Sequence, residues 1–165
     1  MEAKDGKKYY IGDINDEYPA LRPPGFHDIN VSDLKRIFVE PFGSAGARRS
    51  WLCERFSAWF KAIEEVGIPF ELWINGSFAT HKPEPGDIDI VWIFDSDNIQ
   101  TLPSEAGARL DMLLDMNRVK REYACHVQSV MKGDKAMYEY WIYHFGHDRS
   151  ESPKGLFRIF SGGKA

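Results

Sequence analysis

Two aspartates one residue apart, Asp87 and Asp89, open an apolar run, DIDIVWIF, that otherwise has the composition of a buried β-strand. Alternate residues of a strand share a face, so both carboxylates would lie on one side of it. Burying two ionised carboxylates together is unfavourable, because each loses hydration and opposes the ionisation of the other. Magnesium removes both costs, since it prefers carboxylate oxygens and keeps waters and substrate phosphates as further ligands. The spacing therefore indicates a magnesium site.

A Gly-Ser pair, Gly76 and Ser77, precedes the aspartates, and nine residues separate Ser77 from Asp87. Gly76 permits a tight turn and a close approach of the backbone. Ser77 stands where a helical turn would begin, so its hydroxyl and the free N–H groups there can bind phosphate. Lys82, inside the gap, either reaches that phosphate or is a solvated loop lysine. Each feature alone also fits an ordinary turn or strand end, but their combination favours phosphoryl or nucleotidyl transfer.

The composition bounds the class of protein. The chain has 165 residues, 43% of them hydrophobic, which suits one compact domain with a substantial core. Its net charge of −4 argues against general DNA binding. Cys53 and Cys125 have no zinc-site spacing and are expected to be buried free thiols. The polar N-terminus and the lack of a long apolar run predict a cytoplasmic protein with no membrane partner.

Periodicity predicts a mixed α/β (α+β) fold, a small mixed β-sheet flanked by helices. Residues 1–49 are expected to form an extended N-terminal arm with a short helix, ahead of a domain over 50–165. Arg48 and Arg49 fall in a predicted loop, where they either hold an anionic partner or are surface residues. Two prolines in the gap after Ser77 make its flanking strands near neighbours in a partly antiparallel sheet. The expected helices span 50–66, a stretch from 104, and 135–145, and the expected strands span 70–74, 87–94, 123–131 and 156–160.

These motifs resemble a known signature. The stretch INGSF, followed nine residues after its serine by DIDIV, resembles the signature of the polymerase-beta-like nucleotidyltransferase superfamily. The segments NGSFATHKPEPGDIDIV, LRPPGFHDI and FGHDRSESPKGLFRI look more closely like a small bacterial and phage group within it. The resemblance implies a minimal nucleotidyltransferase fold over 50–165. It also makes Lys154, in the shared SPKG element, a residue that points back at the site.

The resemblance further implies an activity and its ligands. Gly76 and Ser77 would hold the triphosphate of an NTP, while Asp87 and Asp89 would bind one or two Mg²⁺ or Mn²⁺ ions. Those ions would orient the α-phosphate and stabilise the leaving pyrophosphate. A hydroxyl of a protein, tRNA or small-molecule acceptor would attack in line. By analogy with other small bacterial members, the chain would act in a toxin–antitoxin or phage-defence system.

One part of the superfamily pattern is missing. A third carboxylate usually comes from the neighbouring strand, here expected at 123–131, which contains no Asp or Glu. His126 occupies that position, and Glu122 lies just before the strand. His126 either ligates a metal, for which manganese or zinc suits imidazole better than magnesium, or is an ordinary hydrogen-bonded histidine. The alternative to an active enzyme is therefore a catalytically impaired nucleotide-binding or partner-binding module.

Overall fold

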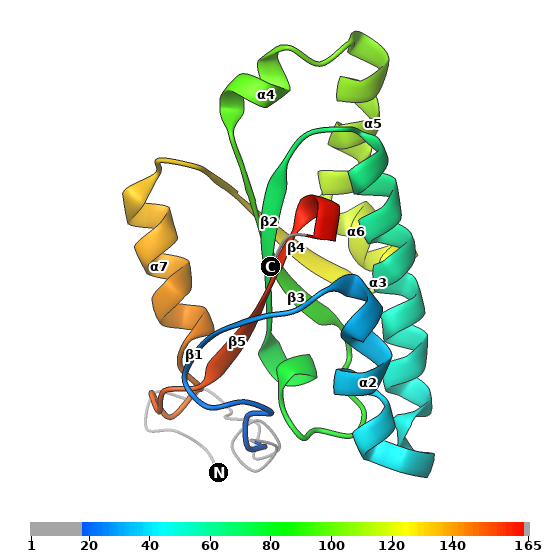
Figure 1. The fold of residues 1–165 in the computed structure, drawn as a ribbon, viewed down its shortest axis with the longest axis vertical. Helices are drawn as coiled ribbons and strands as arrows, with labels where there is room; N and C mark the ends of the chain where they lie inside the picture. The colour runs from blue at the N-terminus through cyan, green and yellow to red at the C-terminus, as the bar shows by residue number, and fades with distance from the viewer. Residues whose placement is uncertain (1–17, 164–165) are drawn as a thin grey trace, which may run out of the picture.

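The computed structural model describes residues 18–163, which form a five-stranded sheet with helices on both faces (Figure 1). The mixed α/β fold expected from the sequence is confirmed. Short 3₁₀ turns lie at Val31–Asp33, Glu40–Gly46, Gly76–Ala79 and Ser161–Gly163. The strands and α-helices are, in order, β1 (Gly25–Asp28), α2 (Leu34–Phe38), α3 (Ala47–Glu65), β2 (Phe70–Asn75), β3 (Ile88–Phe94), α4 (Ser96–Gln100), α5 (Ser104–Leu114), α6 (Met116–Tyr123), β4 (Cys125–Met131), α7 (Lys135–Phe145) and β5 (Gly155–Phe160).

The sheet has the strand order β1-β5-β2-β3-β4. Strand β2 runs antiparallel to β3 and β5, whereas β4 is parallel to β3 and β1 is parallel to β5. The predicted antiparallel pairing of the strands that flank the proline-containing gap is thus confirmed. In this register Asn75 lies opposite Asp89, and Asp89 lies opposite His126. Because partners across a sheet share a face, these three residues form a polar row across β2, β3 and β4.

The two faces of the sheet have separate apolar cores. Helices α2, α3, α5 and α6 cover one face and α7 covers the other (Figure 1). In β3 the alternate residues Ile88, Ile90 and Trp92 belong to the larger core under α3. Val91 and Ile93 belong to the smaller core under α7. On the α7 side, β3 itself is therefore apolar at Val91 and Ile93 and becomes polar at Asp89, where the row with Asn75 and His126 crosses it.

The N-terminal prediction needs a correction. Of the expected arm over 1–49, residues 1–17 lie outside the described residues. Residues 18–28 are exposed or half-buried, as expected of a surface segment, but β1 joins the edge of the sheet as a parallel neighbour of β5. Helix α2 confirms the short helix, and its side chains of Leu34, Ile37 and Phe38 are buried in the larger core. This segment therefore belongs to the same folded unit as the rest of the sheet.

Two helical predictions also differ in their bounds. Helix α3 begins at Ala47, three residues before its expected start, so Arg48 and Arg49 lie in a helix rather than a loop. The helix expected from residue 104 divides at Asp115, whose extended backbone ends α5 and whose carboxylate accepts a hydrogen bond from Arg118 N to cap α6. Both cysteines are buried and unpaired, as expected.

Candidate functional site

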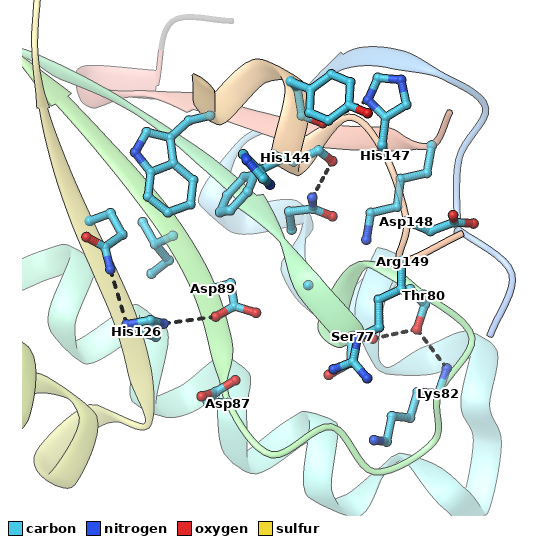
Figure 2. A pocket seen from close by; sticks show the side chains of 18 of the residues that line it. Ser77, Thr80, Lys82, Asp87, Asp89, His126, His144, His147, Asp148 and Arg149 are labelled. Atoms are coloured by element: carbon cyan, nitrogen blue, oxygen red, sulfur yellow. Dashed lines mark hydrogen bonds and ion pairs between the residues drawn. The ribbon is translucent and has the colours of Figure 1, made fainter. Parts of the chain in front are cut away.

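A cleft of about 710 Å³ opens where the polar row crosses the sheet, beside the C-terminal end of α7 (Figure 2). Its volume lies in the range of small-molecule sites. Its walls come from the end of β2 and the following 3₁₀ turn, the starts of β3 and β4, and the α7–β5 loop. Of the residues predicted from the sequence, it brings together Gly76, Ser77, Lys82, Asp87, Asp89, His126 and Lys154.

Gly76 shapes the turn at the base of this cleft. Strand β2 ends at Asn75, and Gly76 then adopts a φ of +71°, in the region that side chains disfavour. A Cβ at this position would overlap Asp89 Oδ2. Ser77 follows in the 3₁₀ turn, and its carbonyl accepts hydrogen bonds from Thr80 N at 3.1 Å and Thr80 Oγ1 at 2.6 Å. The glycine thus lets the Ser77 turn pack directly against the carboxylate.

The two aspartates line the cleft without being sealed in it, since their side chains are 27% and 33% exposed. Asp87 lies just before β3, and its Oδ2 is 3.8 Å from the ammonium of Lys120, a well-exposed side chain. Burial raises the pKa of Asp89 above its ordinary value, and the charge of Asp87 adds to that rise. The charges of His126 and Lys154 act in the opposite direction. Additional positive charge beside Asp89 would therefore stabilise its ionised form.

His126 occupies the position where the sequence lacked a third carboxylate. Its Nδ1 lies 3.3 Å from Asp89 Oδ1, and its Nε2 lies 3.3 Å from the side-chain nitrogen of Gln128 (Figure 2). Glu122 is not an alternative, because it is paired with Arg118 on α6 at 3.1 Å and does not line the cleft. Within residues 18–163 no group of three or more His, Cys, Asp or Glu side chains is arranged to hold a metal ion. A cation here would have the two carboxylates as its main protein ligands.

Arg49 holds the gap between Ser77 and Asp87 in place. Its side chain is fully buried, contrary to the interpretation of the arginine pair as surface residues or an anion site. Among residues 18–163 its guanidinium donates to main-chain carbonyls, and its face stacks on Phe42, 3.8 Å from the ring centroid. Burial lowers the pKa of Arg49 to about 10, so it is still charged at neutral pH. Its acceptors are the carbonyls of Phe38, Ser77, Phe78, Thr80 and Lys82.

Arg48 continues this support at the far end of the gap. It donates to Pro85 O at 3.1 Å and to Gly86 O at 2.7 Å, just before Asp87. The first turn of α3 therefore holds the chain on both sides of Lys82, whose own side chain lines the cleft. The burial of Arg49 could have been predicted from its position in the sequence. Arg49 has the helical spacing of the buried apolar residues of α3, which are Leu52, Cys53, Phe56, Trp59, Phe60 and Ile63.

Sequence reasoning also missed the α7 side of the cleft. Asn75 is 1% exposed, and its Nδ2 donates to the carbonyl of Phe145, the last residue of α7. The aromatic side chains of Tyr140 and Tyr143 line the cleft and are about half exposed. Their rings pack against those of His144 and His147, which Figure 2 labels. The sequence gives little indication that these α7 residues line a cleft, because aromatic residues in a helix are usually expected to be part of the hydrophobic core.

In the comparison with protein families, a family model matches residues 15–160. The matching model is described as a family of unknown function, DUF6932. The chain belongs to DUF6932. The whole lining of the cleft, from Tyr18 to Lys154, falls inside the DUF6932 match. Comparisons with curated proteins and with solved structures gave no match. In the described part of this DUF6932 chain, no helix has the length and apolar character needed to cross a membrane.

Proposed function

We propose that this protein is a divalent-cation-dependent nucleotidyltransferase that moves a nucleoside monophosphate from an NTP to a hydroxyl acceptor. The supporting observation is that Asp87 and Asp89 line one cleft together with Ser77, and that Gly76 brings the serine turn against Asp89 (Figure 2). Carboxylates beside a phosphate-binding turn are the groups that phosphoryl and nucleotidyl transfer require.

The donor set fits a magnesium or manganese ion. Such ions at phosphate sites commonly take one or two carboxylates and complete their shell with water and substrate phosphates. Asp87 and Asp89 would hold the ion, with His126 as a candidate third ligand that favours manganese. The raised pKa of Asp89 fits this role, because a nearby cation offsets both burial and the charge of Asp87. When bound, the ion supplies charge neutralisation to the phosphate oxygens.

The chain's own residues bind and orient the substrate. Ser77 and Lys82 would hold the terminal phosphates, and Lys154 adds positive charge on the same cleft. In the transfer, the acceptor oxygen forms a bond to the α-phosphorus as the bond from that phosphorus to the bridging oxygen breaks. Pyrophosphate leaves, and the hydroxyl proton passes to solvent or to a neighbouring base. The acceptor would be a protein, a tRNA or a small molecule, and a toxin–antitoxin or phage-defence role is part of this proposal.

A second candidate function is nucleotide binding without turnover. It is favoured by one observation, the histidine at position 126 where an acidic residue would assist the attacking hydroxyl. A protein of this kind would sense nucleotides or dock a partner with the same cleft. It predicts NTP binding that depends on Asp87 and Asp89 but releases no pyrophosphate.

One experiment tests both functions. Each α-labelled NTP is incubated with Mg²⁺ or Mn²⁺, the protein and lysate of the host cell, and label transfer and pyrophosphate release are measured. The proposed enzyme labels an acceptor, and Asp89→Ala abolishes the labelling. Asp111→Asn is the matched control, because Asp111 is an exposed carboxylate on α5 outside the cleft. Equal labelling by wild type and Asp89→Ala would refute the proposal, and NTP binding without pyrophosphate release would favour the second function.

A further inference from the structure

Asn75 carries a hydrogen-bond acceptor that the protein leaves unused. Its side chain is almost completely buried, yet the residue lines the cleft between the Ser77 turn and the end of α7. Its Nδ2 donates to Phe145 O, whereas Oδ1 has no hydrogen-bond partner among the described residues. Such groups are rare in folded proteins, because a buried carbonyl oxygen that loses water without gaining a donor is destabilising.

The orientation of this amide is set by its surroundings. Phe145 O is a carbonyl and accepts only, so the amide must present its NH₂ group to it. The oxygen of Asn75 therefore occupies the other position, as a buried acceptor on a residue that lines the cleft. A phosphate oxygen or a carboxylate cannot satisfy it at neutral pH, because neither carries a proton. The group that completes this site must be a donor.

We propose that Asn75 Oδ1 accepts a hydrogen bond from a ribose hydroxyl of the bound nucleotide. This inference rests on the proposed function, which places phosphates at Ser77 and beside Asp89. Asn75 directly precedes the 3₁₀ turn that contains Ser77 and lies opposite Asp89 across the β2–β3 pair. It therefore adjoins the position of the α-phosphate. In a nucleotide the group attached to the α-phosphate is the sugar, whose 2′- and 3′-hydroxyls are the nearest donors.

The site would thus discriminate nucleotides by their sugar. A site built to hydrogen-bond a hydroxyl rejects the analogue that lacks it, because its own buried polar atom is then left unpaired. The exposed rings of Tyr140 and Tyr143 lie on the same side of the cleft, where the base attached to that sugar would project. The competing occupant of the position is a buried water, which would satisfy Oδ1 whether or not a nucleotide is bound.

The test is calorimetric titration of the full chain, in Mg²⁺, with each of the four ribonucleoside triphosphates and its 2′-deoxy and 3′-deoxy counterparts. We expect one of the two deoxy forms to bind roughly tenfold more weakly or worse than the ribonucleotide. We also expect Asn75→Leu, which has a similar size and no acceptor, to abolish that difference. The analogue that loses affinity identifies the donating hydroxyl.

The other outcomes overturn the inference separately from the function. Equal binding of all three sugars by wild type would refute the ribose contact and leave the nucleotidyltransferase proposal standing. A difference that persists in Asn75→Leu would place sugar recognition elsewhere. Binding of no triphosphate would refute the proposed function itself. If Asn75→Leu fails to fold, Asn75→Ala replaces it, because alanine also lacks the acceptor and adds no bulk.

Discussion

Gly76 lies so close to the carboxylate of Asp89 that any side chain at position 76 would overlap Asp89 Oδ2. Strands β2 and β3 are antiparallel, so the end of β2 lies beside the start of β3. Gly76 directly follows β2, and Asp89 lies near the start of β3. The contact places the serine turn and the aspartate pair on a single wall, although nine residues separate Ser77 from Asp87. A phosphate held at the turn would therefore adjoin any cation held by the carboxylates.

Replacing this glycine should damage the site more than the fold. Gly76→Ala introduces a Cβ at a φ of +71° and pushes Asp89 away, so we expect about 1–2 kcal/mol of destabilisation from the backbone strain alone. We also expect loss of the rise in melting temperature produced by NTP with Mg²⁺. Gly86→Ala is the control, because a Cβ there has no atom within 4 Å. Thermal unfolding with and without ligand measures both effects.

Removing the charge of Asp89 should separate metal binding from stability. Because burial and Asp87 raise the pKa of Asp89, its ionised form is disfavoured in the folded protein. We expect Asp89→Asn to be at least as stable as wild type at pH 7 in chelator. We also expect it to lose all stabilisation by Mn²⁺ or Mg²⁺. A melting temperature that rises with Mn²⁺ as much in Asp89→Asn as in wild type would contradict the assignment of this ligand.

Arg49 should be essential for the gap segment. Arg49→Lys keeps a charge, but one ammonium cannot reach the carbonyls of five residues, so buried oxygens lose their donors. We expect a loss of about 3 kcal/mol or more in the free energy of unfolding, measured by urea denaturation.

The neighbouring arginine is the matched control for this change. Arg48 also donates to two carbonyls, but it is not fully buried and stacks on exposed Trp51. We expect Arg48→Lys to cost about 1 kcal/mol or less. Similar losses for Arg48→Lys and Arg49→Lys would show that burial does not distinguish the two side chains.

Glu71 on β2 should make stability depend on pH. Burial is the largest effect on this carboxyl and raises its pKa above the ordinary 4.5. The charge of Arg158 lowers the pKa, and the charge of Asp28 raises it by less than Arg158 lowers it. The folded state then binds this proton more tightly than the unfolded state, so its contribution to stability falls as pH rises above about 4.5. Glu71→Gln, neutral throughout, should be more stable than wild type at pH 7 and gain nothing at pH 4. Chemical unfolding at both pH values checks this, with exposed Glu54→Gln as the control.

The strands and the position of the aspartate pair were predictable because their signals are local. Alternation in DIDIVWIF predicts a strand with Asp89, Val91 and Ile93 on one face, and the structure places them under α7. Pairing of β2 with β3 followed from the prolines in the gap, which exclude a helical crossover. The position of His126 beside Asp89 was expected from the superfamily pattern, which places a third residue on the neighbouring strand, and β4 is that neighbour.

Residues whose roles depend on distant main-chain atoms were not predictable. Arg49 was misread because its partners are carbonyls of segments that carry no complementary charge. From the sequence, Asn75 was only the last residue of a strand. Its amide is oriented by a hydrogen bond to the carbonyl of Phe145 at the end of α7, which the sequence does not reveal. The strand within the expected arm was missed because β1 has just four residues, GFHD, and its strand character comes from pairing with β5.

Recognition of carbonyl oxygens by Arg49 has a consequence for how this family can diverge. Every residue offers the same carbonyl, so substitutions between Ser77 and Asp87 leave the acceptors of the guanidinium unchanged. The conformation of that segment therefore depends on Arg49 in α3, which lies outside the segment itself. Aligned relatives should therefore vary freely in the gap while its length and the arginine stay constant.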